Sequence, residues 1–505
     1  MTALPHVHAT VVHMLDATAR AHGEREALVC GSERLSYEAY RAAVAGFANE
    51  LRRLDLAGKR IALVLGNSID ICIAMFAVHA AGAVCVPLNP IYTIHELGPI
   101  LEDADPAAIV FSESLGATLH PVLDRLAVGA RFAIGSAVGS RRLHHAAADE
   151  SLPEPMPAAA DIATLQYTGG TTGRSKGAIL THGAIATNIS QRQALVPTGT
   201  GGERILCTMP LFHVYAVAMC LHNAVYSAAT LVILPRFTAD AVFATQESER
   251  FTILAGSPTV FTALMADPRF AAGRFEHIRM SYSGSAPLPA ALLGKWEDLT
   301  GAPVLEGYGL SESGPVLSFN PSQGVRKPLS VGLPVPGTQL QIVDAIEGER
   351  VLGIGEIGEI RVRGPQIMRG YRNRPEETAA ALRDGWLYTG DLGELDADGY
   401  LYIRDRKKDM ILVSGYNVYP REVEEVLFGH PDVLEGAVIG VPDDYRGNSV
   451  KAFVVVREGQ GLDEKALDRW CRERLAAYKV PRIYEFIQAL PRTPVGKIDR
   501  KQLRA

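Results

Sequence analysis

A glycine-rich stretch, Tyr167-Thr168-Gly169-Gly170-Thr171-Thr172-Gly173-Arg174-Ser175-Lys176-Gly177, lies between two apolar runs, residues 162–165 and 178–180. It holds four glycines, four serine or threonine hydroxyls and two cations. Glycines let backbone N–H groups turn toward an anion, and the hydroxyls and the mobile charge of Lys176 add donors. Because the flanking runs are apolar, a structured loop is favoured over a flexible linker. We predict a cradle for a polyphosphate.

The spacing of this stretch differs from that of a Walker A loop. The pattern G-x-x-x-x-G-K-[ST] is absent, and Gly177 follows Lys176 where a hydroxyl residue would stand. The sequence therefore predicts a nucleotide triphosphate held on a different scaffold.

Short apolar runs and helical patterns alternate on both sides of the glycine-rich stretch. Residues 35–54 have helical spacing. The apolar run 71–88 has the length of a membrane span, but His79 and Gly82 interrupt it and Pro87 ends it, so we expect a buried helix followed by a buried strand. Further strands are predicted at residues 61–65, 84–88, 107–111, 204–208, 230–234 and 251–255. This alternation is typical of an α/β sheet.

The pattern changes after about Ser330. Residues 339–343 and 358–363 alternate with period two, as half-exposed antiparallel strands do. A charged cluster follows at residues 404–409, and charge runs are usually solvated turns.

The last hundred or so residues have the size of a small domain. They contain a predicted helix at 421–428 and predicted strands at 437–441 and 451–456. We predict an α/β N-terminal domain, residues 1–407, with a β-rich subdomain at about 330–404. A small, mobile α+β C-terminal domain, residues 408–505, completes the chain.

Composition restricts the class of protein. At 505 residues, two or more domains are expected, and 47% hydrophobic and 21% charged residues are ordinary for a globular protein. A net charge of −6 argues against general nucleic-acid binding. The six cysteines lack C-x-x-C spacing, and residues 1–14 do not resemble a signal peptide. We expect a soluble, cytoplasmic protein without a transmembrane segment; the sequence leaves its oligomeric state open, with a homodimer as one possibility.

Three further motifs accompany the glycine-rich stretch in order along the chain: Leu305-Glu306-Gly307-Tyr308-Gly309-Leu310-Ser311-Glu312-Ser313, Tyr388-Thr389-Gly390-Asp391-Leu392 and Pro491-Arg492-Thr493-Pro494-Val495-Gly496-Lys497-Ile498. Together they resemble the acyl-adenylate-forming (AMP-binding) superfamily, from about Leu35 to Leu503. Among its members, the chain is most similar to bacterial medium- and long-chain fatty acyl-CoA synthetases.

The resemblance implies a ligase that uses ATP, Mg²⁺ and coenzyme A. A carboxylate attacks the α-phosphate of ATP, which gives acyl-AMP and pyrophosphate, and CoA then takes the acyl group and releases AMP. Bringing one anion to another calls for cations and N–H donors aimed at the transition state.

The resemblance also implies roles for individual residues. The catalytic set is Lys497, which bridges the acyl carboxylate and the α-phosphate, Glu312, which holds Mg²⁺, Ser311, which approaches the α-phosphate, and His213. The residues implied to contact ATP are Thr168, Gly169, Gly170, Thr171, Thr172, Gly173 and Lys176 around the β- and γ-phosphates, Gly284, Ser285, Ala286, Glu306, Gly307, Tyr308 and Gly309 around adenine, and Asp391 and Arg406 at the ribose.

For the second step, the resemblance implies that the C-terminal domain rotates about Lys408 and opens a pantetheine tunnel. The loop Ser414-Gly415-Tyr416-Asn417 would then face the tunnel, and Lys479 is a candidate for a CoA phosphate. By this resemblance, the charged cluster at residues 404–409 would act as the hinge between the two domains.

The acid itself is less clearly indicated. A lone histidine on an apolar stretch is usually a core residue, but the family places His213 at the active-site gate. We expect Ala216, Ala218 and Cys220 to leave room for an acyl group. Residues 211–231 hold no lysine or arginine, which argues against a diacid. A fatty acid is expected, and an aryl acid of the cinnamate type is the alternative.

A ligase that loads a carrier protein with the acyl group is a further alternative. Two departures from the family pattern are Gly169, where serine is commonest, and Asn448, where glutamate is frequent. The glycine occurs in many bacterial fatty acyl-CoA ligases, so we expect no loss of function there; we have no account of Asn448.

Overall fold

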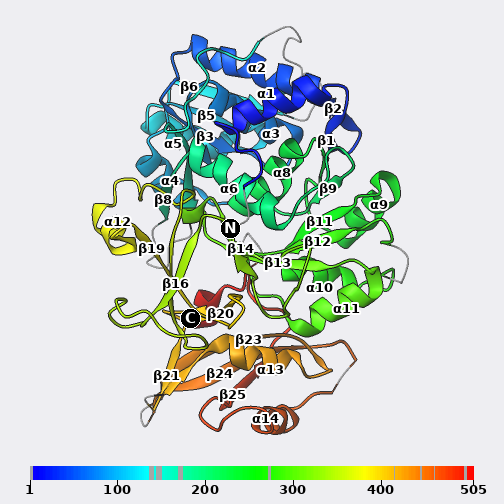
Figure 1. Ribbon diagram of the computed structural model, residues 1–505, viewed down its shortest axis with the longest axis vertical. Helices are drawn as coiled ribbons and strands as arrows, with labels where there is room; N and C mark the ends of the chain where they lie inside the picture. The colour runs from blue at the N-terminus through cyan, green and yellow to red at the C-terminus, as the bar shows by residue number, and fades with distance from the viewer. Residues whose placement is uncertain are drawn as a thin grey trace.

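The computed structural model describes residues 4–135, 141–143, 151–168, 175–270, 275–414, 416–443, 446–459, 461–493 and 497–504. Figure 1 shows a large body that carries the chain from its blue N-terminus to the yellow strands, with a smaller orange and red part below it. The predicted α/β class, with a large N-terminal and a smaller C-terminal domain, is confirmed.

One sheet carries the glycine-rich stretch. Its spatial order is β6 (Ala130–Ile134), β5 (Ala108–Ser112), β3 (Arg60–Val64), β4 (Val84–Pro87), β7 (Ile162–Thr168) and β8 (Lys176–Thr181). Strands β6 to β7 in this order are parallel, whereas β7 and β8 pair antiparallel with Thr168 opposite Lys176. The stretch therefore joins the two strands of an antiparallel pair, and Gly169, Gly170, Thr171, Thr172 and Gly173 lie outside the described residues.

A second, longer sheet contains the other predicted strands of the N-terminal domain. Its order is β15 (Leu333–Pro334), β14 (Val316–Phe319), β13 (Val304–Gly309), β12 (Met280–Ser283), β11 (Ile253–Gly256), β9 (Arg204–Cys207), β10 (Thr230–Ile233), β1 (Glu26–Cys30) and β2 (Glu33–Ser36). The strands from β13 to β1 are parallel, and the edges β14, β15 and β2 are antiparallel.

The two sheets share one core. Helix α3 (Ile69–Ala80) is buried along its whole length, and together with α2 (Tyr37–Arg53) it packs in a core that contains strands of both sheets. The other face of the first sheet is covered by α4 (Ile94–Ala104) and α5 (Gly116–Arg125). The apolar run 71–88 is thus a buried helix followed by β4, as predicted. Within the described residues, no helix is long and apolar enough to span a membrane.

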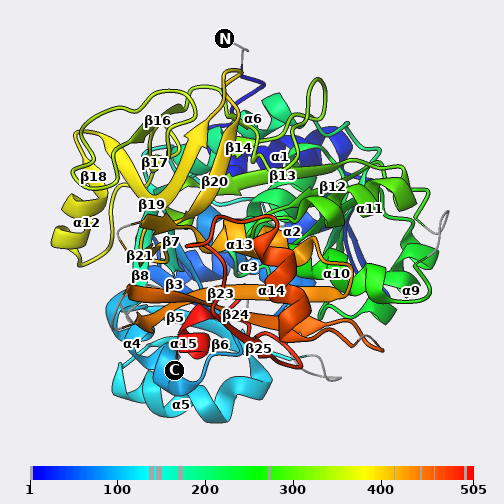
Figure 2. The ribbon, with the colours of Figure 1, turned by 90° about the horizontal axis from the view of Figure 1, so that it is seen from below.

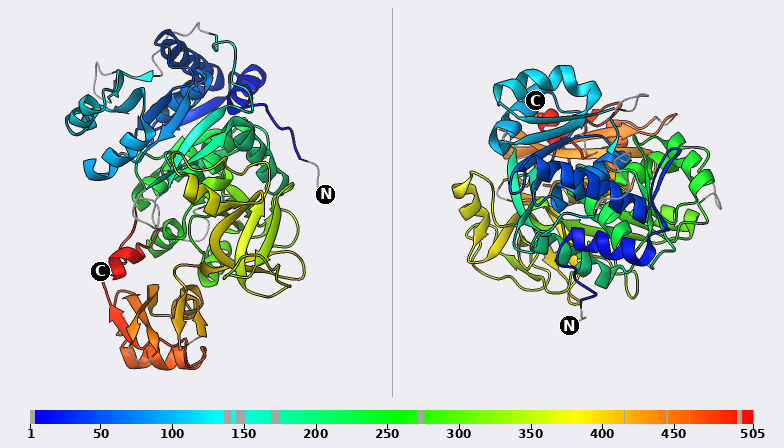
Figure 3. Two further views of the ribbon diagram at one scale, coloured as in Figure 1. Left: turned by 90° about the vertical axis from the view of Figure 1, so that its left-hand side faces the viewer. Right: turned by 90° about the horizontal axis from the view of Figure 1, so that it is seen from above.

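The remaining helices of the body surround this core. They are α1 (Val11–His22), α6 (His182–Leu195), α7 (Val214–Ala216), the π-helical segment η3 (Val217–His222), α8 (Asn223–Tyr226), α9 (Ala239–Glu249), α10 (Pro258–Ala266), α11 (Ala290–Thr300), and the 3-10 turns η1 (Glu113–Leu115) and η4 (Ser311–Ser313). Figure 3 shows α1 and α2 at the end of the molecule opposite the C-terminal part.

The β-rich part follows as predicted. Its antiparallel strands are β16 (Gln339–Val343), β17 (Gly358–Arg363), β19 (Trp386–Leu395), β18 (Leu382–Arg383) and β20 (Leu401–Arg406), with α12 (Pro375–Ala381) before β18. The charged cluster is not wholly a turn, because β20 runs through Arg406 and the turn begins after it.

The C-terminal part has its own sheet and core. It contains β21 (Ile411–Val413), β22 (Tyr416–Val418), α13 (Pro420–Phe428), β23 (Val433–Asp443), β24 (Gly447–Val456), α14 (Glu464–Arg472), β25 (Ile483–Phe486) and α15 (Arg500–Arg504). Helix α13 and the sheet β23–β24–β25 bury a separate apolar cluster. Seen from below in Figure 2, this layer lies across the body, under the ends of several strands of both large sheets.

Candidate active site

A cavity of about 1730 Å³ lies where the large sheets, the β-rich part and the C-terminal part meet. Most of the residues that the sequence singled out line it. Those in the described part of the chain are Thr168, Lys176, His213, Gly284, Ser285, Ala286, Glu306, Gly307, Tyr308, Gly309, Ser311, Glu312, Asp391, Arg406, Lys408 and Lys497.

Pairing between β19 and β20 brings Asp391 and Arg406 together. The two residues are register partners, and Arg406 Nε lies 3.6 Å from Asp391 Oδ1. The phenol of Tyr308, at the end of β13, donates to Asp391 Oδ2 at 2.6 Å. Burial raises the pKa of Asp391, and the charge of Arg406 opposes this shift. The arrangement makes a buried acceptor beside an aromatic ring.

Glu306 is the least exposed carboxyl of this group. The backbone N–H of Leu288 donates to Oε1 at 3.0 Å, whereas Oε2 is buried and has no hydrogen-bond partner among the described residues. Burial raises the pKa of Glu306 to about 7, against the opposing charge of Arg421. A buried polar atom without a partner is costly, so a ligand with a donor at this point would offset the cost.

Glu312 and Lys176 are joined through a residue that sequence reasoning missed. The phenol of Tyr371 donates to Glu312 Oε1 at 2.8 Å, and Lys176 Nζ lies 5.2 Å from the centre of the same ring. Tyr371 belongs to the segment 367–374, which sits outside the recognised motifs, so no local signal marks it.

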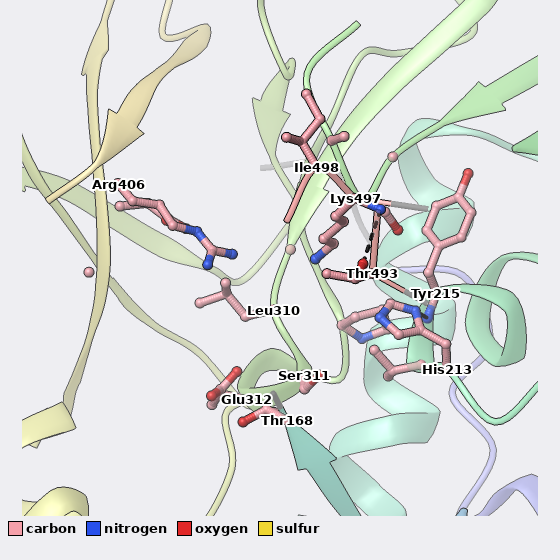
Figure 4. A pocket seen from close by; sticks show the side chains of 18 of the residues that line it. Thr168, His213, Tyr215, Leu310, Ser311, Glu312, Arg406, Thr493, Lys497 and Ile498 are labelled. Carbon is pink, nitrogen blue, oxygen red and sulfur yellow. Dashed lines mark hydrogen bonds and ion pairs between the residues drawn. The ribbon is translucent and has the colours of Figure 1, made fainter. Parts of the chain in front are cut away.

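Lys497 reaches the cavity from the C-terminal part. Its backbone N–H donates to Thr493 Oγ1 at 3.1 Å, and its carbonyl accepts from the N–H of Thr493 at 2.7 Å. Burial lowers the pKa of Lys497 to about 8; Arg406 adds to the shift, and Asp391 and Glu312 oppose it. In Figure 4 the side chains of Lys497, Arg406 and Glu312 extend into one space.

His213 lies near Lys497 in the cavity. Its Nδ1 accepts from the N–H of Tyr215 at 3.3 Å, at the start of α7. Burial lowers the pKa of His213 to about 3, and the charge of Lys497 adds to the shift. The imidazole is therefore neutral at pH 7, which suits a hydrogen-bonding or steric role better than an ionic one.

The wall next to His213 differs from the expectation. The cavity is lined there by Phe212, Val214, Tyr215 and Met219. The small residues that were expected to leave room, Ala216, Ala218 and Cys220, are buried in the core instead. Tyr215 and Met219 are four positions apart in the consecutive helical segments α7 and η3, so both side chains lie on the face that lines the cavity.

Charged residues surround Lys408, the predicted hinge. Burial lowers the pKa of Lys408. Its neighbour Lys407 pairs with Glu359 Oε2 at 2.8 Å, and Glu359 Oε1 accepts from the N–H of Gly390 at 3.2 Å. The segment before Lys408 is thus held through Glu359 on β17 to β19, the strand that carries Asp391.

The predicted CoA-binding residues are not brought to the cavity. Among the described residues that line it, neither Tyr416 nor Lys479 is present. Tyr416 is 59% exposed and stacks on Tyr478, with ring centres 4.7 Å apart, and Lys479 pairs with Glu422 at 2.5 Å. Gly415 lies outside the described residues.

The chain belongs to the AMP-binding enzyme family: the pattern of that family matches residues 15–372, and that of the AMP-binding enzyme C-terminal domain matches residues 422–497. It is 39% identical to a long-chain-fatty-acid–CoA ligase of Bacillus subtilis (strain 168), over 88% of this chain and 85% of that protein. It is 35% identical to a ligase of the same name from Escherichia coli O157:H7, over 99% and 95%. A feruloyl-CoA synthase of an Amycolatopsis species is 38% identical, over 94% of each chain.

Solved structures agree with this assignment. ATP-bound MatB from Rhodopseudomonas palustris superposes with a TM-score of 0.91 at 33% identity, with 98% of each chain covered. The anthranilate CoA ligase AuaEII in complex with anthranoyl-AMP gives a TM-score of 0.90 at 28% identity, over 99% of this chain and 97% of that one.

These relatives confirm the predicted family and the AMP-forming acyl-CoA ligase activity, and they support the use of ATP and CoA. Mg²⁺, the domain boundary at 407/408, the roles of the site residues, a homodimer, the lack of nucleic-acid binding and the cytoplasmic location stay predictions.

Proposed function

We propose that the protein activates a medium- or long-chain fatty acid as acyl-AMP and then forms the acyl-CoA thioester. The observation that carries the proposal is that Lys497, from the C-terminal part, meets Asp391, Arg406 and Glu312, from the body, in one cavity. An ammonium at this point offsets the repulsion between the acid and the α-phosphate.

The other site residues would bind ATP along the cavity. Tyr308 stacks on adenine, and the unpartnered oxygen of Glu306 accepts from the exocyclic amine. Asp391 accepts from the ribose hydroxyls beside Arg406, a charge-assisted arrangement. Thr168 and Lys176, at the facing ends of β7 and β8, hold the β- and γ-phosphates, and Ser311 approaches the α-phosphate.

The donor set fits Mg²⁺ only together with the nucleotide. No group of three ligating side chains occurs among the described residues, and Glu312 is the carboxylate next to the phosphate cradle. Mg²⁺ commonly takes one or two carboxylates, phosphate oxygens and waters, so Glu312 would hold it. When bound, it would neutralise charge on the departing pyrophosphate.

For the second step we propose rotation of the C-terminal part about Lys408. Lys497 then leaves the cavity, and Tyr416 and Lys479, now at a distance from it, approach the CoA path. Their present position suits the adenylation step, in which Lys497 is in place.

The residues of the cavity wall support a fatty acid as the preferred substrate. The side chains of Phe212, Val214 and Met219 are apolar, and residues 211–231 hold no lysine or arginine to pair with a second carboxylate. The likeness to a feruloyl-CoA synthase and the aromatic ring of Tyr215 favour an aryl acid as the second candidate.

A pyrophosphate-release screen tests the proposal. Acids of graded chain length and aryl acids are compared with and without CoA, and AMP is measured in parallel. We expect turnover with C8 to C18 acids that needs CoA. Turnover with aryl acids alone would establish the second candidate, and a pyrophosphate burst without CoA-dependent AMP would indicate a ligase that loads a carrier protein.

A further inference from the structure

Tyr371 contacts both the Glu312 carboxylate and the Lys176 ammonium, which flank the predicted phosphate cradle. It belongs neither to the glycine-rich stretch nor to the motif that contains Glu312. Its hydroxyl donates to Glu312 Oε1 at 2.8 Å, and its ring lies beneath Lys176 Nζ, with 5.2 Å from the nitrogen to the ring centre. Tyr371 itself lines the cavity.

The backbone around Tyr371 ties the same two elements together. The N–H of Met368 donates to the carbonyl of Glu312 at 2.8 Å. On the other side, the N–H of Arg372 donates to the carbonyl of Gly177 at 2.9 Å, and Tyr371 bridges Ala178 on β8. Segment 368–372 therefore spans the space between η4 and the start of β8.

The backbone of Tyr371 is also held by a partner outside η4 and β8. Its N–H donates to Thr378 Oγ1 at 2.9 Å, and Thr378 Oγ1 in turn donates to the carbonyl of Arg374 at 2.7 Å, in the first turn of α12.

We propose that Tyr371 is a positioning residue: its hydroxyl fixes the Glu312 carboxylate for the metal, and its ring holds Lys176 at the phosphates. The two tasks use different parts of the side chain. A hydrogen bond to a charged acceptor fixes the rotation of the carboxylate, and a cation over an aromatic face is attracted by the ring quadrupole. The inference rests on the proposed role of Glu312 as the metal ligand.

The experiment measures nucleotide binding without turnover. Isothermal titration with α,β-methylene-ATP, whose α–β linkage cannot be cleaved, gives Kd with Mg²⁺ and with EDTA. The ratio of these two Kd values is the coupling between metal and nucleotide. Tyr371→Phe removes only the hydroxyl, and Tyr371→Leu removes the ring as well.

For Tyr371→Phe we expect the coupling ratio to fall about tenfold, as for loss of a hydrogen bond to a charged group, while Kd in EDTA stays within about twofold. Tyr371→Leu should weaken binding in EDTA too, by about threefold, because the cation–π contact is lost.

Tyr400→Phe is the matched control. Tyr400 also lies under a lysine, Lys327 at 4.6 Å, and its hydroxyl donates to the Val325 carbonyl, but it does not line the cavity within the described chain. Its coupling ratio should equal that of the wild type, and thermal melts report any general loss of stability in each variant.

Two outcomes overturn the inference. If both Kd values of Tyr371→Phe equal those of the wild type, the hydroxyl does not serve the metal; if both are weakened equally, its role is merely structural. Failure of the proposed function is distinguishable, because the wild-type protein would then show no effect of Mg²⁺ on nucleotide binding.

Discussion

At the scale of a single residue, burial of the Lys497 ammonium favours its interaction with incoming anions. Its side chain is buried in a cavity that also contains Arg406. Burial disfavours the charged ammonium, and the nearby carboxylates of Asp391 and Glu312 offset only part of this desolvation penalty. An ammonium that is poorly solvated in the empty cavity gains most when anions arrive. This gives the proposed catalytic role a physical reason beyond its place in a motif.

Replacement of this lysine should separate the two half-reactions. Lys497→Ala is expected to lower acyl-AMP formation at least about a hundredfold, because the charge between the acid and the α-phosphate is removed. Thioester formation from preformed acyl-AMP should stay within about threefold of the wild-type rate. Both rates are measured by rapid quench, and equal losses in the two would contradict the assignment.

The pH dependence of adenylation should report the same group. The pKa of Lys497 is lowered to about 8, so the ammonium is present below this pH and is lost above it. We expect kcat/KM for ATP, which reports the free enzyme, to be highest below pH 8 and to fall toward pH 10. Lys497→Arg, which keeps its charge, should be slower but flat across this range. A wild-type rate that rises above pH 8 would refute the interpretation.

At the scale of elements, the loop after β12 is packed against Tyr215 in the cavity wall. A Cβ on Gly284 would lie 2.6 Å from Tyr215 Cε2. The Tyr215 ring cannot easily yield, because its hydroxyl donates to the carbonyl of Tyr282 at 3.0 Å. The glycine therefore allows the loop at the predicted adenine pocket to contact Tyr215 closely.

Gly284→Ala should consequently damage substrate use. We expect kcat/KM for the acid to fall about tenfold, since overpacking strains the contact between this loop and Tyr215, and both line the cavity. Gly294→Ala is the control: this glycine lies in α11 with open space around its Cβ position, and alanine favours a helix. Steady-state kinetics and thermal melts of both variants test this prediction. If Gly284→Ala has the same kcat/KM as the wild type, the loop and Tyr215 can accommodate the added methyl group without loss of activity.

At the scale of the whole molecule, contacts between body and C-terminal part hold the arrangement that contains Lys497. Glu425, on α13, faces the start of α11 in the body: burial raises the pKa of its carboxyl group, and the charge of Arg421 and the backbone of Ala290 oppose this shift. Arg421, also on α13, donates to the carbonyl of Ile403 at 2.7 Å. A carboxylate at a helix N-terminus is stabilised by the helix dipole.

Removal of this charge should shift the balance between the two steps. Glu425→Gln is expected to slow acyl-AMP formation by about two- to tenfold, while thioester formation from preformed acyl-AMP is unchanged or faster. Asp468→Asn on α14, which pairs only with Arg472 among its recorded ion pairs in the described chain, serves as control. An equal effect of Glu425→Gln on both half-reactions would show that the contact does not select a conformation.

The sequence by itself determined the alternation of strands and helices and the order of the motifs, because both depend on residue type and local spacing. The buried helix α3 and the antiparallel character of β16 and β17 could be predicted for that reason. So could the pairing of Asp391 with Arg406 in one site, although only through resemblance to a family.

Tertiary structure alone decided which side chains meet across long separations. Tyr371 reaches Glu312 over 59 positions, and Met219 rather than Ala218 lines the cavity. The position of the C-terminal part places Lys497 in the cavity and leaves Tyr416 and Lys479 outside it. Such contacts depend on how whole elements pack against one another, and local sequence periodicity does not predict that packing.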